Sequence, residues 1–415
     1  MGELQEQYDR KNYRLNLAEG VLYISSAAFI SVQIVLPALI ERLGGGNVIV
    51  GILPVVVYVG LFLPQVFAAR YVETLLWKKG WTLRYGFLQR MMTLLIALAV
   101  LFFGSSWPTA ALVLFLVFFS LHYVFAGIGT PAWFDLFTRI TPLRKRGRLA
   151  GFRSSLGGVS AFLCGLVLTW LLATFDFPLN YALGFFIAFG LQMSSLLVQM
   201  SMVEVEPSRA MDRRPVFTYL QRLPEVFRSN GDFRQFIISS AFLIVANMPI
   251  GFFTVYALKN FSADEAMVGQ FTLSMLLTQA VSALISGFIV DRYGNKRALI
   301  IAACGMLGAT LWALAAPTLG WFRLVYMFLG VNVGTELMAR YNISAEYGPA
   351  EQRPRYVALM NTVLAPVYFS AMAGGIISNA FGYQTLFVVS AAFSLVGLFL
   401  LVTRVRDPRQ SAVVR

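Results

Sequence analysis

Long apolar runs recur throughout this chain, and they limit its fold more than any other feature of the sequence. Examples are residues 48–63, 91–103, 110–121 and 376–401. A helix needs about 20 mostly apolar residues to cross a bilayer, and lipid offers no hydrogen-bond partner to an exposed backbone. The runs are too long and too uniformly apolar for the strands of a membrane barrel. The sequence therefore predicts an all-α polytopic membrane protein.

The composition excludes an ordinary soluble domain. Of the 415 residues, 58% are hydrophobic and 13% are charged, whereas a soluble domain is about half apolar and about a quarter charged. One histidine and two isolated cysteines, Cys164 and Cys304, form neither a zinc-binding pattern nor a disulfide framework. The sequence also contains no phosphate-binding loop motif. We expect no metal, no cofactor and no enzymatic activity.

Twelve membrane-spanning helices are expected, six in each half of the chain. A polar interval separates the halves, so we predict an N-terminal six-helix bundle at 1–202, a cytoplasmic linker at 203–232 and a C-terminal six-helix bundle at 233–415. The predicted spans are 16–41, 47–75, 84–104, 109–140, 150–174, 179–202, 233–258, 265–290, 297–316, 320–345, 355–380 and 383–403.

The placement of basic residues predicts the orientation of these helices. If both termini are cytoplasmic, 28 of the 33 Lys and Arg residues fall in inside segments. Arg42, Lys259 and Arg323 fall outside, while Arg90 and Arg340 lie within helices. Cytoplasmic loops of membrane proteins carry such an excess of basic residues. We therefore place both termini in the cytoplasm and the protein in the cytoplasmic (inner) membrane.

The net charge of +13 has an explanation that involves no nucleic acid. Basic clusters beside membrane spans face anionic lipid headgroups, which attract them. We expect a monomer whose partners are a small-molecule substrate and the lipid bilayer, with anionic lipid at the cytoplasmic face. The first sixteen residues carry acids as well as bases, so no cleaved targeting segment is expected.

The two halves repeat one another at a constant offset of 207 residues. This offset pairs Pro142 with Pro349 and Arg146 with Arg353. Each member of a pair lies between the fourth and fifth predicted span of its half. Repeats in the same orientation occur in transporters, whose substrate sites lie at the interface between the repeats.

The loop between the eighth and ninth spans resembles the signature of the major facilitator superfamily. Its sequence GFIVDRYGNKR follows the family pattern G-x-x-x-D-R-x-G-R-[RK]-[RK], with Asn295 where a base is usual. A second family pattern, E/R-x-x-P-x-x-x-R, is matched from Arg139 to Arg146 and again from Glu346 to Arg353. Helix number, linker and repeat extend the resemblance over the whole chain. It implies two six-helix bundles that work by alternating access, and it does not indicate a substrate.

The loop between the second and third spans departs from the family pattern. It keeps Lys78, Lys79, Gly80 and Arg84 but has no acid at the expected position. We therefore expect the inner gate of the first half to be weaker or differently locked.

The resemblance implies an ion-pair latch between the halves on the cytoplasmic side. Asp135 is expected to partner the basic loop between the second and third spans, through Arg84. Pairs that form in one state and break in the other make a bistable gate. The alternative is that these charges only set the topology. The expected gate residues are Asp135, Arg139, Arg146, Arg84, Asp291, Arg292, Arg297, Glu346 and Arg353.

Glu336 is the deepest acid of the predicted helices, about 5 Å from the midpoint of the tenth span. Ionisable groups inside a bilayer are costly, so such an acid is a functional candidate. Arg340 follows at i+4, where the two side chains can pair. The pair either neutralises a buried charge or forms a site. In the second case Glu336 exchanges a proton or binds a cationic or hydroxylated solute, and Arg340 tunes its affinity for protons.

Four other polar residues lie at central depths in the predicted spans. His122 is a secondary candidate for carrying a proton, although a lone membrane histidine is usually a packing residue. Gln33, Asn247 and Asn332 lie on the first, seventh and tenth spans, which the resemblance places around the central cavity. Each alone could simply bond a neighbouring helix, and their convergence is what indicates a site.

Glycine and proline interrupt three of the predicted spans. The stretches are AGIGTPAW in the fourth, NMPIG in the seventh, and LAP with AGG in the eleventh. Inside helices these residues permit kinks and close helix approach. We expect motion at these places.

The residues favour a secondary transporter that moves a small organic solute by alternating access, coupled to protons through Glu336. One alternative is an uncoupled facilitator in which Glu336 and Arg340 are a structural pair. Another is a transporter of lipids or other amphipaths. A third is a membrane receptor or assembly factor that has the same fold and does not transport.

Overall fold

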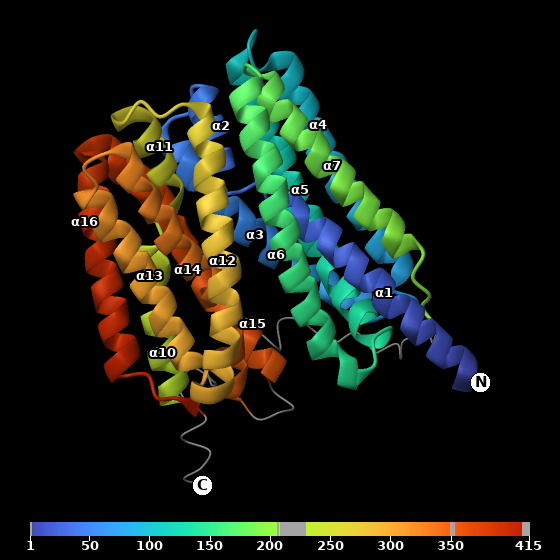
Figure 1. Ribbon diagram of the computed structural model, residues 1–415. Helices are drawn as coiled ribbons and strands as arrows, with labels where there is room; N and C mark the ends of the chain where they lie inside the picture. The colour runs from blue at the N-terminus through green and yellow to red at the C-terminus, as the bar shows by residue number, and fades with distance from the viewer. Residues whose placement is uncertain (1, 206, 208–229, 349–352, 409–415) are drawn as a thin grey trace. The chain divides into compact units, whose positions relative to one another are not determined.

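Helices make up every regular element that the structure describes (Figure 1). The structure is a computed structural model, and it describes residues 2–205, 207, 230–348 and 353–408. The chain forms two compact units: unit 1 contains residues 1–31 and 56–216, and unit 2 contains residues 32–55 and 217–415. The predicted domains 1–202 and 233–415 stay predictions. Most of the predicted linker lies outside the described residues.

Apart from the first, the predicted spans lie close to the observed helices. Helix α3 (Asn47–Val72) begins in unit 2 and continues into unit 1. The other helices of unit 1 are α1 (Gly2–Ser26), α4 (Lys79–Phe103), α5 (Pro108–Arg139), α6 (Leu143–Thr174) and α7 (Leu179–Met200). Those of unit 2 are α2 (Val35–Arg42), α10 (Gly231–Ala246), α11 (Ile250–Asn260), α12 (Glu265–Tyr293), α13 (Asn295–Ala315), α14 (Leu319–Glu346), α15 (Arg353–Leu364), the 3-10 helix η2 (Ala365–Phe369) and α16 (Ser370–Thr403).

Nine helical segments of the described chain are long and apolar enough to cross a membrane. The last of them, Tyr356–Thr403, holds two of the predicted spans, which meet at Gly382, where a φ of +83° interrupts the helix. The helix α14 and the broken pair α1 and α2 are richer in polar residues, and they correspond to the remaining predicted spans. The arrangement is consistent with twelve crossings, and the chain is a multi-pass membrane protein.

Two of the three predicted interruptions are breaks in the helices. In the seventh span, α10 ends at Ala246 and α11 begins at Ile250, because Pro249 has no N–H to donate and disfavours helical backbone before it. In the eleventh span, Pro366 lies in η2 between α15 and α16. The fourth span differs, because α5 continues through Pro131 as one helix.

The first predicted span, 16–41, is two helices rather than one. α1 ends at Ser26, residues 27–34 form turns, and α2 begins at Val35. α2 packs against α11 and α12 within unit 2. Ser31 and Gln33, followed by Pro37 in the first turn of α2, were the available signals of this break.

Two ion pairs join α2 to its neighbours in unit 2. Arg42 Nε lies 3.1 Å from Glu265 Oε1 at the start of α12, and Lys259 Nζ of α11 lies 3.1 Å from Glu41 Oε2. These cations are two of the three bases expected on the outer side, and the third, Arg323, donates to a glutamine of α12. Bases on the outer side would oppose the usual charge bias, and these contacts give each of the three a polar partner.

Reversing one outer ion pair tests its contribution to stability. Glu41→Lys brings two cations together and Lys259→Glu brings two anions together, whereas the double variant recreates the pair. Because the pair is partly exposed, each single change should lower the free energy of unfolding by about 1 kcal/mol, and the double variant should recover most of this loss. Thermal unfolding of the purified protein measures the difference. The prediction is contradicted if the double variant loses as much free energy of unfolding as the two single variants lose together.

Candidate functional site

Helix α14 sets the direction in which Glu336 points. Gly330 and Gly334, one turn apart, face α12, and a Cβ atom at either position would overlap atoms of that helix. Glu336 follows two residues later, which rotates it about 200° away from this contact. The G-x-x-x-G spacing was available in the sequence and was missed there. It directs the acid towards α10.

Glu336 and Arg340 form the predicted ion pair between Oε1 and Nη2. Both side chains are largely buried, at 17% exposed for Glu336 and 7% for Arg340. Arg340 Nη1 also donates to the hydroxyl of Tyr368 in η2, at 3.2 Å. A buried charge is tolerated when it is paired and hydrogen-bonded, and these contacts meet that requirement.

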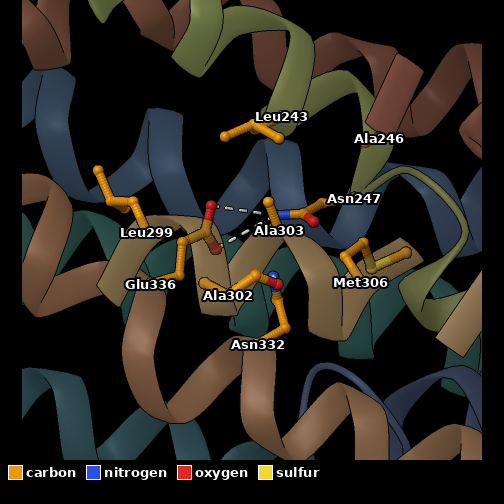
Figure 2. Close-up of a pocket in the computed structure, with 9 residues that line it drawn as sticks. All are labelled: Leu243, Ala246, Asn247, Leu299, Ala302, Ala303, Met306, Asn332 and Glu336. Atoms are coloured by element: carbon orange, nitrogen blue, oxygen red, sulfur yellow. Dashed lines mark hydrogen bonds between the residues drawn. The ribbon is translucent and has the colours of Figure 1, made fainter. Parts of the chain in front are cut away.

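Asn247 connects the ion pair to the break in the seventh span. It caps the end of α10, and its Nδ2 donates to Oε1 and Oε2 of Glu336 at 3.3 and 3.2 Å (Figure 2). Both residues were predicted as site candidates, and the structure brings them into contact. The carboxylate therefore links α14 to residues 247–249, which separate α10 from α11 and which we name the α10–α11 hinge.

A small cavity lies beside the carboxylate of Glu336. Its volume is about 10 Å³, comparable with the space that one water molecule needs. Asn332 is part of its wall, and its Nδ2 donates to Ala302 O at 3.0 Å. An organic solute does not fit in this volume, so binding one beside Glu336 requires the surrounding helices to move apart. Figure 2 shows the residues around it: Leu243, Ala246, Asn247, Leu299, Ala302, Ala303, Met306, Asn332 and Glu336.

His122 and Gln33 are not part of this cluster. His122 lies on α5 in unit 1, where Nδ1 is 3.1 Å from Gln89 O and Nε2 is 3.1 Å from Gln89 Nε2. A neutral ring with its proton on Nδ1 satisfies both contacts. This geometry fits the packing role considered above for a lone membrane histidine. Gln33 lies in the turn between α1 and α2, in unit 2.

A buried ion pair in unit 1 was missed at the sequence level. Glu19 of α1 is buried, and Arg153 Nη1 of α6 donates to its Oε2 at 2.7 Å. Ser195 Oγ of α7 donates to its other carboxylate oxygen at 3.4 Å. Gly20 makes room for this pair, because a Cβ atom there would overlap the guanidinium of Arg153. The available signal was an acid inside the first predicted span.

Arg90 of α4 extends this cluster. Its Nε donates to Gln192 O at 2.6 Å and its Nη1 donates to Gly86 O at 2.8 Å. Its Nη2 donates to Ser195 Oγ at 3.4 Å, which connects it to the acid of α1. Carbonyl and hydroxyl oxygens therefore satisfy the second buried cation of unit 1, and the cluster holds α1, α4, α6 and α7 together.

An acid from outside the loop holds the connection between α3 and α4. Glu204, just after α7, accepts hydrogen bonds from the backbone N–H groups of Lys78 and Lys79 at 3.0 and 2.9 Å. It also lies 3.6 Å from Arg139 Nη1. The unpaired N–H groups at a helix N-terminus stabilise a carboxylate placed there. Glu204 thus takes the place of the acid that the loop lacks.

Asp135 has Lys78 as its partner in place of the expected Arg84. Asp135 Oδ2 lies 3.9 Å from Lys78 Nζ, which also donates to the carbonyls of Val72, the last residue of α3, and of Leu75 in the loop that follows. Burial lowers the pKa of Lys78, and the charge of Asp135 opposes this shift. Arg84 lies more than one turn inside α4, where it is exposed beside an apolar groove between α4 and α7.

Arg146 binds the end of α5 rather than an acid. Its Nε donates to Thr141 O at 3.0 Å, and its Nη2 donates to Thr138 O. The last carbonyls of a helix have no partner within the helix, and a basic side chain can satisfy them. Arg146 therefore stabilises the turn between α5 and α6.

The signature loop of the second half forms the turn from α12 to α13. Gly294 has a φ of +87°, and Asp407 occupies the space that a Cβ atom would need. Asn295, which departs from the family pattern, donates to Glu346 Oε1 at 2.9 Å. A neutral donor thus joins the start of α13 to the end of α14 where the family usually has a base.

The remaining gate candidates lie at the same end of unit 2. The guanidinium groups of Arg292 and Arg297 lie over the ring of Tyr293. Asp291 is exposed near the end of α12. Arg353 begins α15, and its side chain lies outside the described part of the structure. The latch between the halves stays a prediction.

Comparisons with known sequences identify the chain's relatives. The family model for the Major Facilitator Superfamily matches residues 235–415. A niacin transporter, NiaP, of Acinetobacter baylyi is 23% identical over 141 residues, which are 34% of this chain and 32% of that protein. A 4-hydroxybenzoate transporter, PcaK, of the same organism is 26% identical over 158 residues, which are 37% of this chain and 34% of that protein. The matches thus span about a third of these relatives.

Comparisons with solved structures extend the likeness to nearly the whole chain. A D-xylose-proton symporter gives a TM-score of 0.72 at 14% identity, covering 97% of this chain and 99% of that one. A bacterial homologue of the human lysosomal transporter Spinster gives 0.68 at 15% identity, covering 97% and 98%. At such identities the likeness concerns the fold.

Glu204→Gln tests the connection between α3 and α4. Glutamine keeps the size of the side chain and removes the charge that faces the start of α4 and Arg139. We expect the free energy of unfolding to fall by about 1–2 kcal/mol, since the carboxylate is buried at a helix N-terminus. Thermal unfolding measures the loss, and Glu73→Gln, which changes an exposed acid after α3, is the matched control. Equal melting temperatures of the two variants would contradict the role of Glu204.

Proposed function

We propose that the chain is a secondary transporter of the major facilitator superfamily, whose family model matches its second half, and that it moves a small organic solute driven by protons that bind Glu336. The fold shared with a D-xylose-proton symporter supports this proposal. So do the partial matches to transporters of niacin and 4-hydroxybenzoate. The bacterial sources of these relatives favour the cytoplasmic membrane as the location. The solute would be exposed alternately to the two sides of the membrane.

The observation that carries the proposal is the contact of a buried carboxylate with a cation and a helix break. Glu336 touches Arg340 on its own helix and Asn247 at the α10–α11 hinge. A charged group inside a membrane is costly, and its presence indicates a function in ion or substrate handling. A purely structural ion pair would not need the contact with the hinge.

A proton on Glu336 changes both contacts. The ionised carboxylate accepts two hydrogen bonds from the Asn247 amide and pairs with Arg340, whereas the protonated acid carries no charge and itself becomes a donor. The hinge between α10 and α11 therefore meets a different partner in each protonation state. A ligand shifts a conformational equilibrium only through such differential contacts. Glu336 would in this way couple proton binding to movement of the seventh span.

Glu336→Gln tests the coupling. The amide cannot bind a proton in the range where the carboxyl does, so the variant should lose accumulation of solute driven by a pH gradient. Reconstituted vesicles measure this accumulation for a solute chosen from a thermal-shift screen of sugars, amino acids, organic acids, drugs and lipids, since ligands raise apparent stability by mass action. Asp176→Asn, which changes an exposed acid between α6 and α7, is the control and should keep the parent's accumulation.

The same measurement separates the alternatives. Accumulation that survives in Glu336→Gln and still follows the pH gradient would refute Glu336 as the coupling site. A parent protein that equilibrates the solute without accumulating it would be an uncoupled facilitator, with Glu336 and Arg340 as a structural pair.

A further inference from the structure

Arg340 is a buried cation whose charged partner among the described residues is Glu336. The other polar groups near the pair are uncharged. They include Asn247 after α10, Tyr368 from η2, and Asn332 and Tyr341 from α14. α13 contributes apolar wall residues, and the face of α14 towards α12 is formed by glycines. Within the part of the chain that the structure describes, one carboxylate therefore balances the charge of Arg340.

That balance is lost when Glu336 takes up a proton. The carboxylate becomes a neutral carboxylic acid, while the guanidinium keeps its charge. Removing one partner of a buried ion pair leaves an uncompensated charge, which is strongly unfavourable. The hydrogen bond from Arg340 to the Tyr368 hydroxyl does not involve Glu336, so it can hold the guanidinium in place. Proton uptake thus turns a satisfied cation into one that needs an anion.

We propose that Arg340 binds the carboxylate of a small organic acid, and that a proton on Glu336 frees Arg340 for this role. The inference rests on the proposed function and names its substrate class. The planar guanidinium offers paired N–H donors that match the two oxygens of a carboxylate. A neutral solute would leave the buried charge uncompensated, and a cationic solute would add a second charge beside it.

The exchange has a defined stoichiometry. One proton joins a Glu336 oxygen, the ion pair with Arg340 separates, and one substrate carboxylate takes the place of the Glu336 carboxylate. The site holds one positive and one negative charge before and after the exchange. A proton and a monocarboxylate therefore cross the membrane together without net transfer of charge. The sequence left open whether Glu336 exchanges a proton or binds a cationic or hydroxylated solute. The proposed exchange takes the first of these roles for Glu336 and assigns the substrate contact to Arg340.

Binding measurements on the purified full-length protein test this exchange, because they need no knowledge of the natural solute. The probes are acetate, benzoate and nicotinate, each paired with its uncharged amide. Binding linked to one proton weakens about tenfold per pH unit above the titration of the carboxyl. The parent should show this slope for a carboxylate, and Glu336→Gln should bind the same carboxylate tightly with no such slope. Neither protein should bind the amides.

Two further variants separate a binding role from a structural one. Arg340→Gln and the double variant Glu336→Gln with Arg340→Gln should lose carboxylate binding. The double variant has no unpaired buried charge, so its unfolding temperature should lie close to the parent's. Arg404→Gln, which changes an exposed arginine after α16, should bind as the parent does.

The outcomes distinguish this inference from the function on which it rests. If Glu336→Gln binds no carboxylate more tightly than the double variant, or prefers the amides, the Arg340 site is refuted. Accumulation that depends on Glu336 would then still support proton coupling. If Glu336→Gln accumulates solute along the pH gradient, the proton site itself is refuted, whatever Arg340 binds.

Discussion

The cost of placing charge inside a bilayer is the constraint on which the rest of this structure depends. Each unit buries ionised groups, and each charge is met by a counter-charge or by backbone oxygens. In unit 2 the pair is Glu336 and Arg340, and in unit 1 it is Glu19 and Arg153, with Arg90 held by carbonyls. Such groups are expensive to insert, so their retention points to a use. The two pairs differ in their surroundings. The pair of unit 1 lies in a hydrogen-bonded cluster, whereas the pair of unit 2 touches a helix break.

The contact with a helix break is what makes the pair of unit 2 suitable for coupling. Pro249 removes a backbone hydrogen bond and leaves α10 and α11 as separate segments. Asn247 ends the first of these and donates to Glu336. A change of charge on one carboxylate can therefore alter the contact that holds the break. A rigid, unbroken helix would have no comparable place to respond. The same loss of charge on Glu336 leaves Arg340 without a counter-charge. In the proposed exchange, the carboxylate of the substrate then supplies it.

Much of the architecture was accessible from the sequence, because apolar length and charge bias act locally. All predicted spans but the first match the helices, and the proline at 249 predicted the break in the seventh span. The pairing of Glu336 with Arg340 followed from their spacing on one helix. Several contacts between residues far apart in the chain were not predicted. Glu204 reaches the start of α4 across more than a hundred residues, and Lys78 rather than Arg84 meets Asp135. Which of several bases lies nearest an acid depends on how the helices pack, which spacing alone does not determine.

What the sequence determined and what the tertiary structure decided therefore have separate physical origins in this protein. Hydrophobic length and the positions of glycine and proline act within one segment, and they suffice to set the membrane class and most helix ends, while the basic loops predict the orientation. Side-chain direction depends on contacts between segments. The close packing of Gly330 and Gly334 on α12 turns Glu336 towards Asn247, and the position of α2 against α11 and α12 gives the outer bases their partners. Only the packing of helices distant in sequence could decide the direction of Glu336 and the partners of these bases. The reason is that a buried charge is stable only where the fold brings it a partner.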